Sequence, residues 1–87
     1  MALLTLSRKP DDQQLELFNL WLTADDWVLL SGDARSMMWQ PNPTLAKGCI
    51  RREDAQSMAG TAHPDWLLID DDDWVRLSAE HSPLVHW

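Results

Sequence analysis

The sequence predicts a small α/β protein, a single domain over residues 1–87 in which helices flank a mostly parallel sheet. Short apolar runs bounded by turn residues alternate with segments of helical spacing, and this alternation is typical of strand–helix–strand units. A chain of 87 residues has room for one domain and buries about 60% of the surface that its unfolded form exposes. No repeat, low-complexity segment or linker interrupts the pattern.

The first third of the chain predicts a strand, a helix and a second strand. Residues 2–6 form a short apolar run ended by Ser7 and Pro10, and this length suits a buried strand. From residue 11 to residue 24, apolar side chains recur at helical intervals behind an acidic start that favours the N-terminal end of a helix. The uninterrupted apolar run at 27–30 predicts a central strand covered on both faces.

The middle of the chain is less regular. Residues 33–39 fit a short helical piece, and the prolines at 41 and 43 then break any helix. Residues 45–50 resemble a strand only in part, because a lysine and a glycine interrupt the apolar run. Residues 52–59 predict a short helix closed by Gly60, since glycine adopts the left-handed cap conformation at little cost.

The last third contains the clearest strand, at residues 66–69. Four consecutive aspartates at 70–73 then open a helix, which Pro83 ends. The tail at 84–87 carries three apolar side chains, too many to leave in water. We therefore expect Trp87 to be docked, either on its own chain or on a partner.

The balance of charge disfavours direct binding to nucleic acid. Asp and Glu number 14 against 7 Lys and Arg, which gives a formal net charge of −7. Basic residues that would displace counterions from a phosphate backbone are scattered, and Arg51 and Arg52 are the only adjacent arginines. No apolar segment approaches the roughly 18 residues that a membrane span needs, and no secretory leader is evident. We expect neither a membrane span nor secretion.

Cys49 is the only cysteine, which excludes an internal disulfide and an all-cysteine metal site and fits a reducing cytoplasm. It is also the only candidate nucleophile. Positive charge from Arg51 and Arg52 could lower the pKa of its thiol, as a persulfide carrier would require. The alternative is a small buried side chain on a strand, and this alternative is favoured because no base or glycine-rich nest accompanies the cysteine.

Neither the acidic run nor the histidines predict a metal centre. The aspartates at 70–73 could offer oxygen ligands to Mg²⁺ or Ca²⁺, but their placement in a first helical turn is better explained by the helix dipole. His63, His81 and His86 lack zinc-ligand spacing with Cys49; we expect His63 in a turn and the other two in polar or interfacial positions. Phosphate-binding and hydrolase motifs are missing, so we expect no cofactor, metal or catalytic residue.

Six tryptophans are more than one small core normally uses. Aromatic side chains are favoured in cores and at subunit interfaces alike, so all six could be core or half-exposed residues. A domain this small has limited stability of its own. We expect that some of the tryptophans face a partner and that the protein is an oligomer.

Taken together, several short strings are similar to the DsrH/TusB family. They are LLTL at 3–6, VLL at 28–30, LLID at 67–70 and DWVRL at 73–77, with HS at 81–82 and the tryptophan at 87 as the close of the chain. Apart from residues 36–48, the resemblance covers nearly the whole chain. It implies a DsrE/F/H-like fold and a place in a heterohexamer with DsrE/TusD-like and DsrF/TusC-like subunits.

The resemblance also implies a task in sulfur transfer. In the Tus system, persulfide sulfur is passed towards 2-thiouridine at the tRNA wobble position, whereas the Dsr system serves dissimilatory sulfur oxidation. The carrier cysteine of the Tus relay belongs to the DsrE/TusD-type subunit. Some DsrH proteins carry a cysteine in the first helix, but residues 11–24 contain none. This departure favours a non-catalytic subunit close to the TusB pattern.

Three functions remain open at this stage. The leading one is an accessory subunit of a sulfur-relay complex, for tRNA thiolation in the first place and for sulfur oxidation in the second. The rival is a sulfurtransferase that carries persulfide on Cys49, and the third is a stand-alone homo-oligomer with a binding role. Neighbouring genes for DsrE- and DsrF-like subunits, with or without those for a dissimilatory sulfite reductase, would separate the two relay roles.

Overall fold

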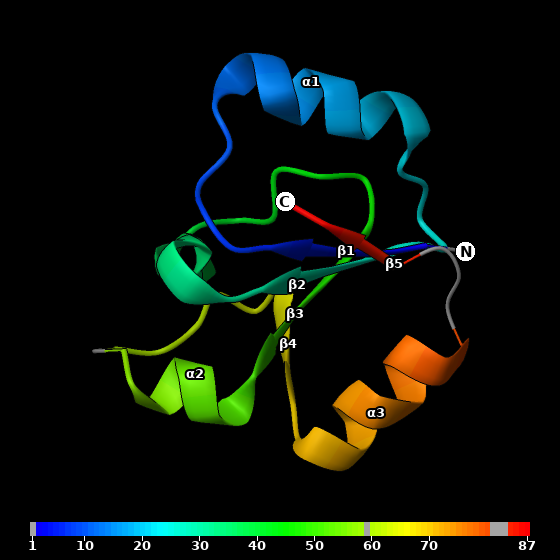
Figure 1. Cartoon of the computed structure of the whole chain (residues 1–87). Helices are drawn as coiled ribbons and strands as arrows, with labels where there is room; N and C mark the ends of the chain where they lie inside the picture. The colour runs from blue at the N-terminus through cyan, green and yellow to red at the C-terminus, as the bar shows by residue number, and fades with distance from the viewer. Residues whose placement is uncertain (1, 59, 81–83) are drawn as a thin grey trace.

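The computed structural model describes residues 2–58, 60–80 and 84–87 and contains a five-stranded parallel sheet with helices on both faces (Figure 1). In chain order the elements are β1 (Leu3–Leu6), α1 (Asp12–Trp21), β2 (Trp27–Leu30), the 3-10 helix η1 (Gly32–Trp39), β3 (Lys47–Arg51), α2 (Arg52–Gln56), β4 (Trp66–Ile69), α3 (Asp71–Glu80) and β5 (Leu84–His86). All four strand pairs are parallel, in the order β4-β3-β2-β1-β5. The predicted α/β class is confirmed.

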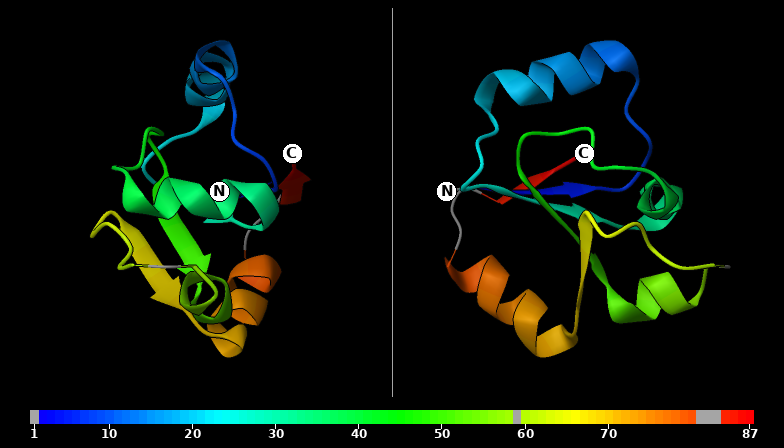
Figure 2. Two further views of the ribbon diagram at one scale, coloured as in Figure 1. Left: turned by 90° about the vertical axis from the view of Figure 1, so that its left-hand side faces the viewer. Right: turned by 180° about the vertical axis from the view of Figure 1, so that it is seen from behind.

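The chain adds strands on one side of β1 and then returns to its other side. β2, β3 and β4 follow one another outward, and α3 leads back across the sheet to β5. Because parallel crossovers are right-handed, this reversal moves α3 to the face opposite α1. Figure 2 shows α1 and α3 on opposite sides of the sheet. The connections that follow β3 and β4 therefore leave these neighbouring strands toward opposite faces, to α2 and to α3.

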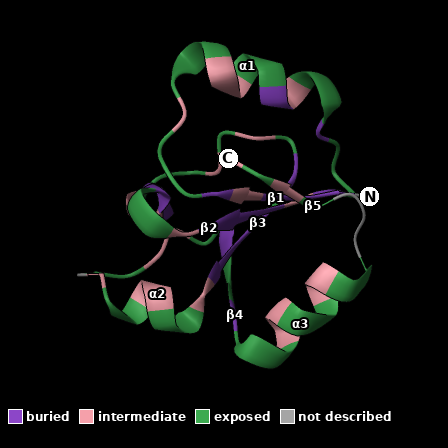
Figure 3. Ribbon diagram, in the orientation of Figure 1, coloured by how far each residue is buried: buried purple, intermediate pink, exposed green. Residues whose placement is uncertain are grey.

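The two faces of the sheet bury separate cores, and the strands carry most of the buried residues (Figure 3). The first core lies under α1 and η1 and takes alternate strand residues such as Leu4, Val28 and Ile50, together with Phe18 of α1. The second core is smaller and lies against Trp74 and Leu77 of α3. Its fully buried members are Leu3, Leu29, Cys49 and Ile69. This division follows from the side-chain alternation of a strand.

The predicted first helix is real but shorter than residues 11–24. Asp11 is its N-cap: the Asp11 carboxylate accepts from the Gln14 backbone N–H at 2.8 Å, and the Gln14 side chain accepts from the Asp11 N–H at 3.0 Å. This capping box satisfies two backbone donors that a helix start leaves without partners. Leu22 is already extended, with ψ 139, and its N–H donates to the Phe18 carbonyl at 2.8 Å.

The middle of the chain corrects one prediction and confirms another. The helical piece at 33–39 is present as η1, one residue longer. The strand predicted at 45–50 begins later, at Lys47, and the glycine taken as an interruption lies inside it. Gly48 is paired with Trp66 of β4, and a Cβ atom at Gly48 would collide with the Trp66 ring. The glycine therefore makes room for a buried tryptophan.

The last two helices also differ in extent from their predictions. The helix predicted at 52–59 is regular only to Gln56, and Gly60 takes the predicted left-handed conformation, with φ +88, beyond the helix end. The helix after β4 begins at Asp71, and Asp70 precedes it as a cap: the Asp73 N–H donates to the Asp70 carboxylate at 2.8 Å. The predicted stop at Pro83 lies outside the described residues.

The tail docks on its own chain, as one of the two expected alternatives. β5 pairs in parallel with β1, the Trp87 N–H donates to the Thr5 carbonyl at 2.8 Å, and the Ser7 N–H donates to the main-chain oxygen of Trp87 at 2.6 Å. The Trp87 ring packs edge-on against Phe18, with centroids 5.6 Å apart, and the Arg8 guanidinium lies 4.3 Å from its centroid. Trp87 thus connects the edge of the sheet to α1.

Candidate functional site

Cys49, the one candidate nucleophile, lies in the middle of β3 and is completely buried. Its neighbours in the second core are Leu3, Leu29 and Ile69. Burial in this apolar environment raises the pKa of the thiol to about 12. The prediction that nearby positive charge would lower this pKa is therefore wrong.

The arginines beyond Cys49 have other partners. The Arg51 guanidinium donates to the Asp71 carboxylate and lies 3.9 Å from the Glu53 carboxylate. The Asp71 hydrogen bond, which joins the ends of β3 and β4, raises the pKa of Arg51. Arg51 therefore fastens α3 to the sheet, and its charge is balanced by these carboxylates.

The aspartates at 70–73 perform the structural role that their position predicts. Asp70 and Asp73 exchange a reciprocal capping pair, in which the Asp70 N–H donates to the Asp73 carboxylate at 3.4 Å. The hydrogen bond from the Asp73 N–H lowers the pKa of Asp70. Among the residues that the structure describes, no three His, Cys, Asp or Glu side chains form a group able to hold a metal ion.

His63 and His86, the two histidines that the structure describes, lie in different parts of the molecule. His63 stands at the start of a turn, where its Nδ1 accepts from the Asp65 N–H at 3.1 Å and its carbonyl accepts from the Trp66 N–H at 3.0 Å. This is the turn role expected from the sequence. His86 is exposed in β5, at the far edge of the sheet, and His81 lies outside the described residues.

An open parallel sheet usually binds its ligand where the connections from the carboxyl ends of two neighbouring strands leave toward opposite faces. In this protein those strands are β3 and β4, and the hydrogen bond from Arg51 to Asp71 lies at their ends. The chain is also closely packed at the carboxyl ends of β1 and β5. The Ser7 N–H and hydroxyl both donate to the main-chain oxygen of Trp87, at 2.6 and 2.8 Å. The Ser7 carbonyl in turn accepts from the Asp33 N–H at 2.9 Å.

The loop after β2 closes tightly over the same point. Gly32 has φ +51, and a Cβ atom there would lie 2.8 Å from the Ser7 carbonyl oxygen. Only glycine fits this close approach without strain. The loop therefore packs against β1 and presents no free N–H nest to a ligand at Asp33.

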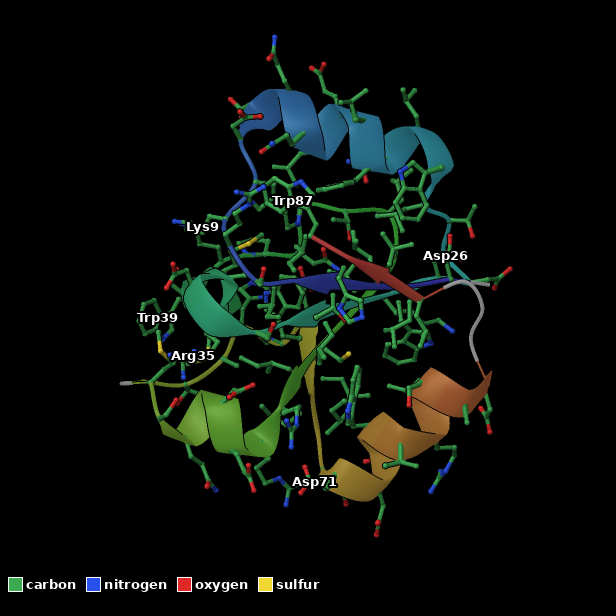
Figure 4. The ribbon with its side chains drawn as sticks, viewed as in Figure 1. Lys9, Asp26, Arg35, Trp39, Asp71 and Trp87 are labelled. Atoms are coloured by element: carbon green, nitrogen blue, oxygen red, sulfur yellow. The ribbon has the colours of Figure 1, made fainter. Side chains whose placement is uncertain are left out.

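Basic residues gather near the carboxyl ends of the strands although the protein is acidic overall. Five of the seven Lys and Arg residues follow the carboxyl ends of β1, β2 and β3: Arg8, Lys9, Arg35, Arg51 and Arg52. Figure 4 shows Lys9 and Arg35 at the same end of the molecule as Trp39, with Asp26 at the other end. Arg35 donates to the Gly32 carbonyl at 2.8 Å and to the Ser57 hydroxyl at 2.7 Å, so it holds neighbouring loops together.

A shallow hollow of about 540 Å³ lies at the opposite ends of β3 and β4. Its polar residues are engaged in holding the loop before β3: the Asn42 side chain donates to the Ala46 carbonyl at 2.8 Å, and the Asp65 carboxylate accepts from the Asn42 N–H at 3.0 Å. Lys47 contributes an ammonium 5.5 Å from the centroid of the Trp27 ring.

Asp26 is the buried charge that sequence reasoning missed. Its carboxylate accepts from the Ala2 N–H at 2.6 Å and from the Thr23 N–H at 2.7 Å, and so joins the start of β1 to the loop before β2. The hydrogen bond from Ala2 is the main cause that lowers the pKa of Asp26. The position of Asp26 directly before an apolar strand was the only sequence signal for its burial. Its hydrogen-bond partners, Ala2 and Thr23, lie 24 and 3 residues away in the sequence.

No protein-family model and no curated protein matches this chain. Within residues 2–58, 60–80 and 84–87, no helix is both long and apolar enough to cross a bilayer.

Proposed function

We propose that this protein is a non-catalytic subunit of a sulfur-relay complex of the DsrH/TusB type, acting in 2-thiolation of the tRNA wobble uridine. The observation that carries the proposal is the burial of Cys49, the only thiol of the chain. A relay subunit without a usable thiol can contribute structure and contacts but cannot carry sulfur.

The raised pKa of Cys49 also leaves very little thiolate at neutral pH. A thiol with a pKa of about 12 is ionised in only about one molecule in 10⁵ at pH 7, against a few per cent for an ordinary cysteine. The thiolate is the form that attacks a sulfur donor, and the side chain is also closed to a donor by its apolar neighbours. Both effects disfavour the rival hypothesis of a persulfide on Cys49.

The fold and the resemblance support the same proposal. The strings that are similar to the DsrH/TusB family form β1, β2, β4 and α3 and end at the docked Trp87. A parallel α/β sheet is the fold class that the resemblance implies.

Two of the six tryptophans are exposed at the surface of the molecule. Trp66 is buried, Trp27, Trp74 and Trp87 are half-buried, and Trp21 and Trp39 are exposed. Trp21 and Trp39, at 42% and 45% exposure, place large apolar surface in water. Aromatic residues of this kind are enriched at subunit interfaces.

Reconstitution with DsrE- and DsrF-like subunits from the same organism tests the proposal. We expect the three chains to co-purify as a hetero-oligomer, and we expect omission of this chain to reduce both assembly and sulfur transfer. The Cys49→Ala variant should restore both. A single-sulfur mass gain on Cys49 of the folded wild-type protein, after incubation with a sulfur donor, would establish the rival hypothesis instead. Loss of 2-thiouridine from tRNA on gene deletion would distinguish the tRNA role from sulfur oxidation.

A further inference from the structure

Helix α1 turns a broad apolar surface away from the rest of the molecule. Leu20 is 82% exposed, Leu17 59% and Trp21 42%, and Leu45 in the loop before β3 is 62% exposed. We call these four residues the α1 surface. Of the ten residues of α1, only Phe18 is buried. A helix with more large apolar side chains in water than in the core is unusual in an isolated protein.

The four residues lie on neighbouring parts of the molecule. Leu17 and Leu20 share a helix face with Gln13 and Glu16, and these four residues line a hollow of about 380 Å³. Leu45 is brought to the flank of α1 by Asn19, whose side chain accepts from the Leu45 N–H at 3.0 Å and donates to the Pro43 carbonyl at 3.2 Å. Figure 1 shows α1 along one side of the molecule, with the loop before β3 running between it and the sheet.

The α1 surface is held in shape before any partner binds. The capping box at Asp11 fixes the start of α1, and the hydrogen bonds of Asn19 fix its middle against the loop. The Trp21 ring packs edge-on against Phe18, with centroids 6.3 Å apart, and Phe18 rests on Trp87. A preformed surface binds with a smaller loss of conformational entropy.

The charges around the α1 surface select its partner. Residues 11–25 contain four acidic residues and no Lys or Arg, and the buried Asp26 adds no charge to the surface. Glu16 lies on the exposed face itself, beside Leu17 and Leu20. In a symmetric dimer the same patch meets itself, so a second copy would bring acids against acids. A surface that is apolar in the centre and basic at the rim complements the α1 surface in both respects.

We propose that the α1 surface docks on a subunit of the relay complex whose contact face is apolar and rimmed by Lys or Arg. This inference rests on the proposed function and adds the contact face and the chemistry of the partner. Leu17 and Leu20 provide the apolar centre of the contact, Trp21 and Leu45 extend it, and Glu16 pairs with a basic residue of the partner.

The test compares wild type with the double variant Leu17→Ser/Leu20→Ser in titrations against the DsrE- and DsrF-like subunits. Both leucines are exposed, so thermal unfolding of the isolated double variant should match that of wild type. The matched control is Val75→Ser, an apolar helix residue of α3 that is 62% exposed. We expect the double variant to weaken assembly at least about tenfold, and the control to change it less than about twofold.

A charge variant tests the chemistry of the partner. We expect Glu16→Lys to weaken assembly several-fold at low salt and to lose this effect in high salt, because salt screens charges at an interface rim. Glu80→Lys, on the exposed end of α3, is the matched control and should have little effect. Hydrogen exchange in the wild-type complex should show protection of residues 12–21.

The outcomes separate the two proposals. If wild-type protein does not assemble with the related subunits, the proposed function and the docking inference both fail. If wild type and the double variant assemble equally, the function stands and the inference is overturned. A homodimer, or binding to vesicles of mixed neutral and anionic lipid, that the double variant abolishes would overturn the inference in favour of another occupant.

Discussion

Replacing Trp87 with alanine should destabilise the isolated protein, because this side chain packs against Phe18 of α1. Truncating a fully buried tryptophan costs about 3–5 kcal/mol, and Trp87 is half-buried, so about half of that applies. Loss of the edge-on contact with Phe18 adds about 0.5–1.5 kcal/mol. We expect a total loss of about 2–4 kcal/mol in the free energy of unfolding.

That loss is large for a domain of this size. At about 0.05–0.15 kcal/mol per residue, a chain of 87 residues has a stability of about 4–13 kcal/mol. A loss of 2 kcal/mol or more should lower the midpoint of thermal unfolding by at least about 8 °C. The deletion of residues 84–87 should cost still more, since it also removes the backbone pairing of β5 with β1.

Far-UV circular dichroism during urea and thermal unfolding measures the effect without interference from the other tryptophans. Leu84→Ala is the control: its side chain lies in the same strand but is 49% exposed, and we expect a loss below about 1 kcal/mol. A Trp87→Ala loss under about 0.5 kcal/mol would refute the argument that Trp87 holds α1. Unchanged stability together with lost assembly would assign the docking role to a partner's surface instead.

Three further predictions follow from buried positions. Gly48→Ala should cost at least about 1–3 kcal/mol in urea unfolding, because the added methyl group meets the Trp66 ring and lies 2.9 Å from the Asn42 side-chain nitrogen; unchanged stability would show that Trp66 moves freely. Asp26→Asn should cost about 1.5–3 kcal/mol at pH 7, because the amide cannot accept from both Ala2 and Thr23 N–H groups through separate oxygens. The pKa of Asp26 is lowered in the folded protein, so the carboxylate contributes to stability above its ordinary pKa near 3.9, and this contribution is lost as the pH falls through the folded-state pKa. The variant should therefore lose less stability than wild type as the pH falls into the acid range. An identical dependence of stability on acid pH would argue against this role of Asp26. The Cys49 thiol should resist maleimide labelling in native buffer and react fully in denaturant, and rapid labelling of the folded protein would contradict its burial.

Much of the fold follows from local pattern. The runs at 27–30 and 66–69 coincide with β2 and β4 because short uninterrupted apolar runs between turn residues are typical of strands, even where the strand lies at the sheet edge, as β4 does. The extent of β3 could not be predicted in the same way. Gly48 looks like an interruption until its partner Trp66, 18 residues later, is placed beside it in the sheet.

The candidate site shows the same limit. Sequence reasoning identified Cys49 as the only possible nucleophile, but two arginines nearby in sequence suggested a lowered pKa. In the fold, Asp71 binds the Arg51 guanidinium, and apolar side chains from three other strands surround the thiol. Both facts depend on long-range contacts. The same is true of Asp26, whose main hydrogen bond reaches the start of β1.

The pairing of β5 with β1 also constrains how the protein is made. The Ser7 hydroxyl and Trp87 are 80 positions apart, yet their contact closes one edge of the sheet. During synthesis, Phe18 can therefore gain its contact with the Trp87 ring only after residue 87 has left the ribosome, although Trp21 of the same helix is already present. Until then α1 lacks its contact with Trp87, and the nascent chain exposes Phe18 on the inner face of the helix as well as Leu17 and Leu20 on its outer face. Assembly with any partner through α1 is thereby delayed until the last strand has been added.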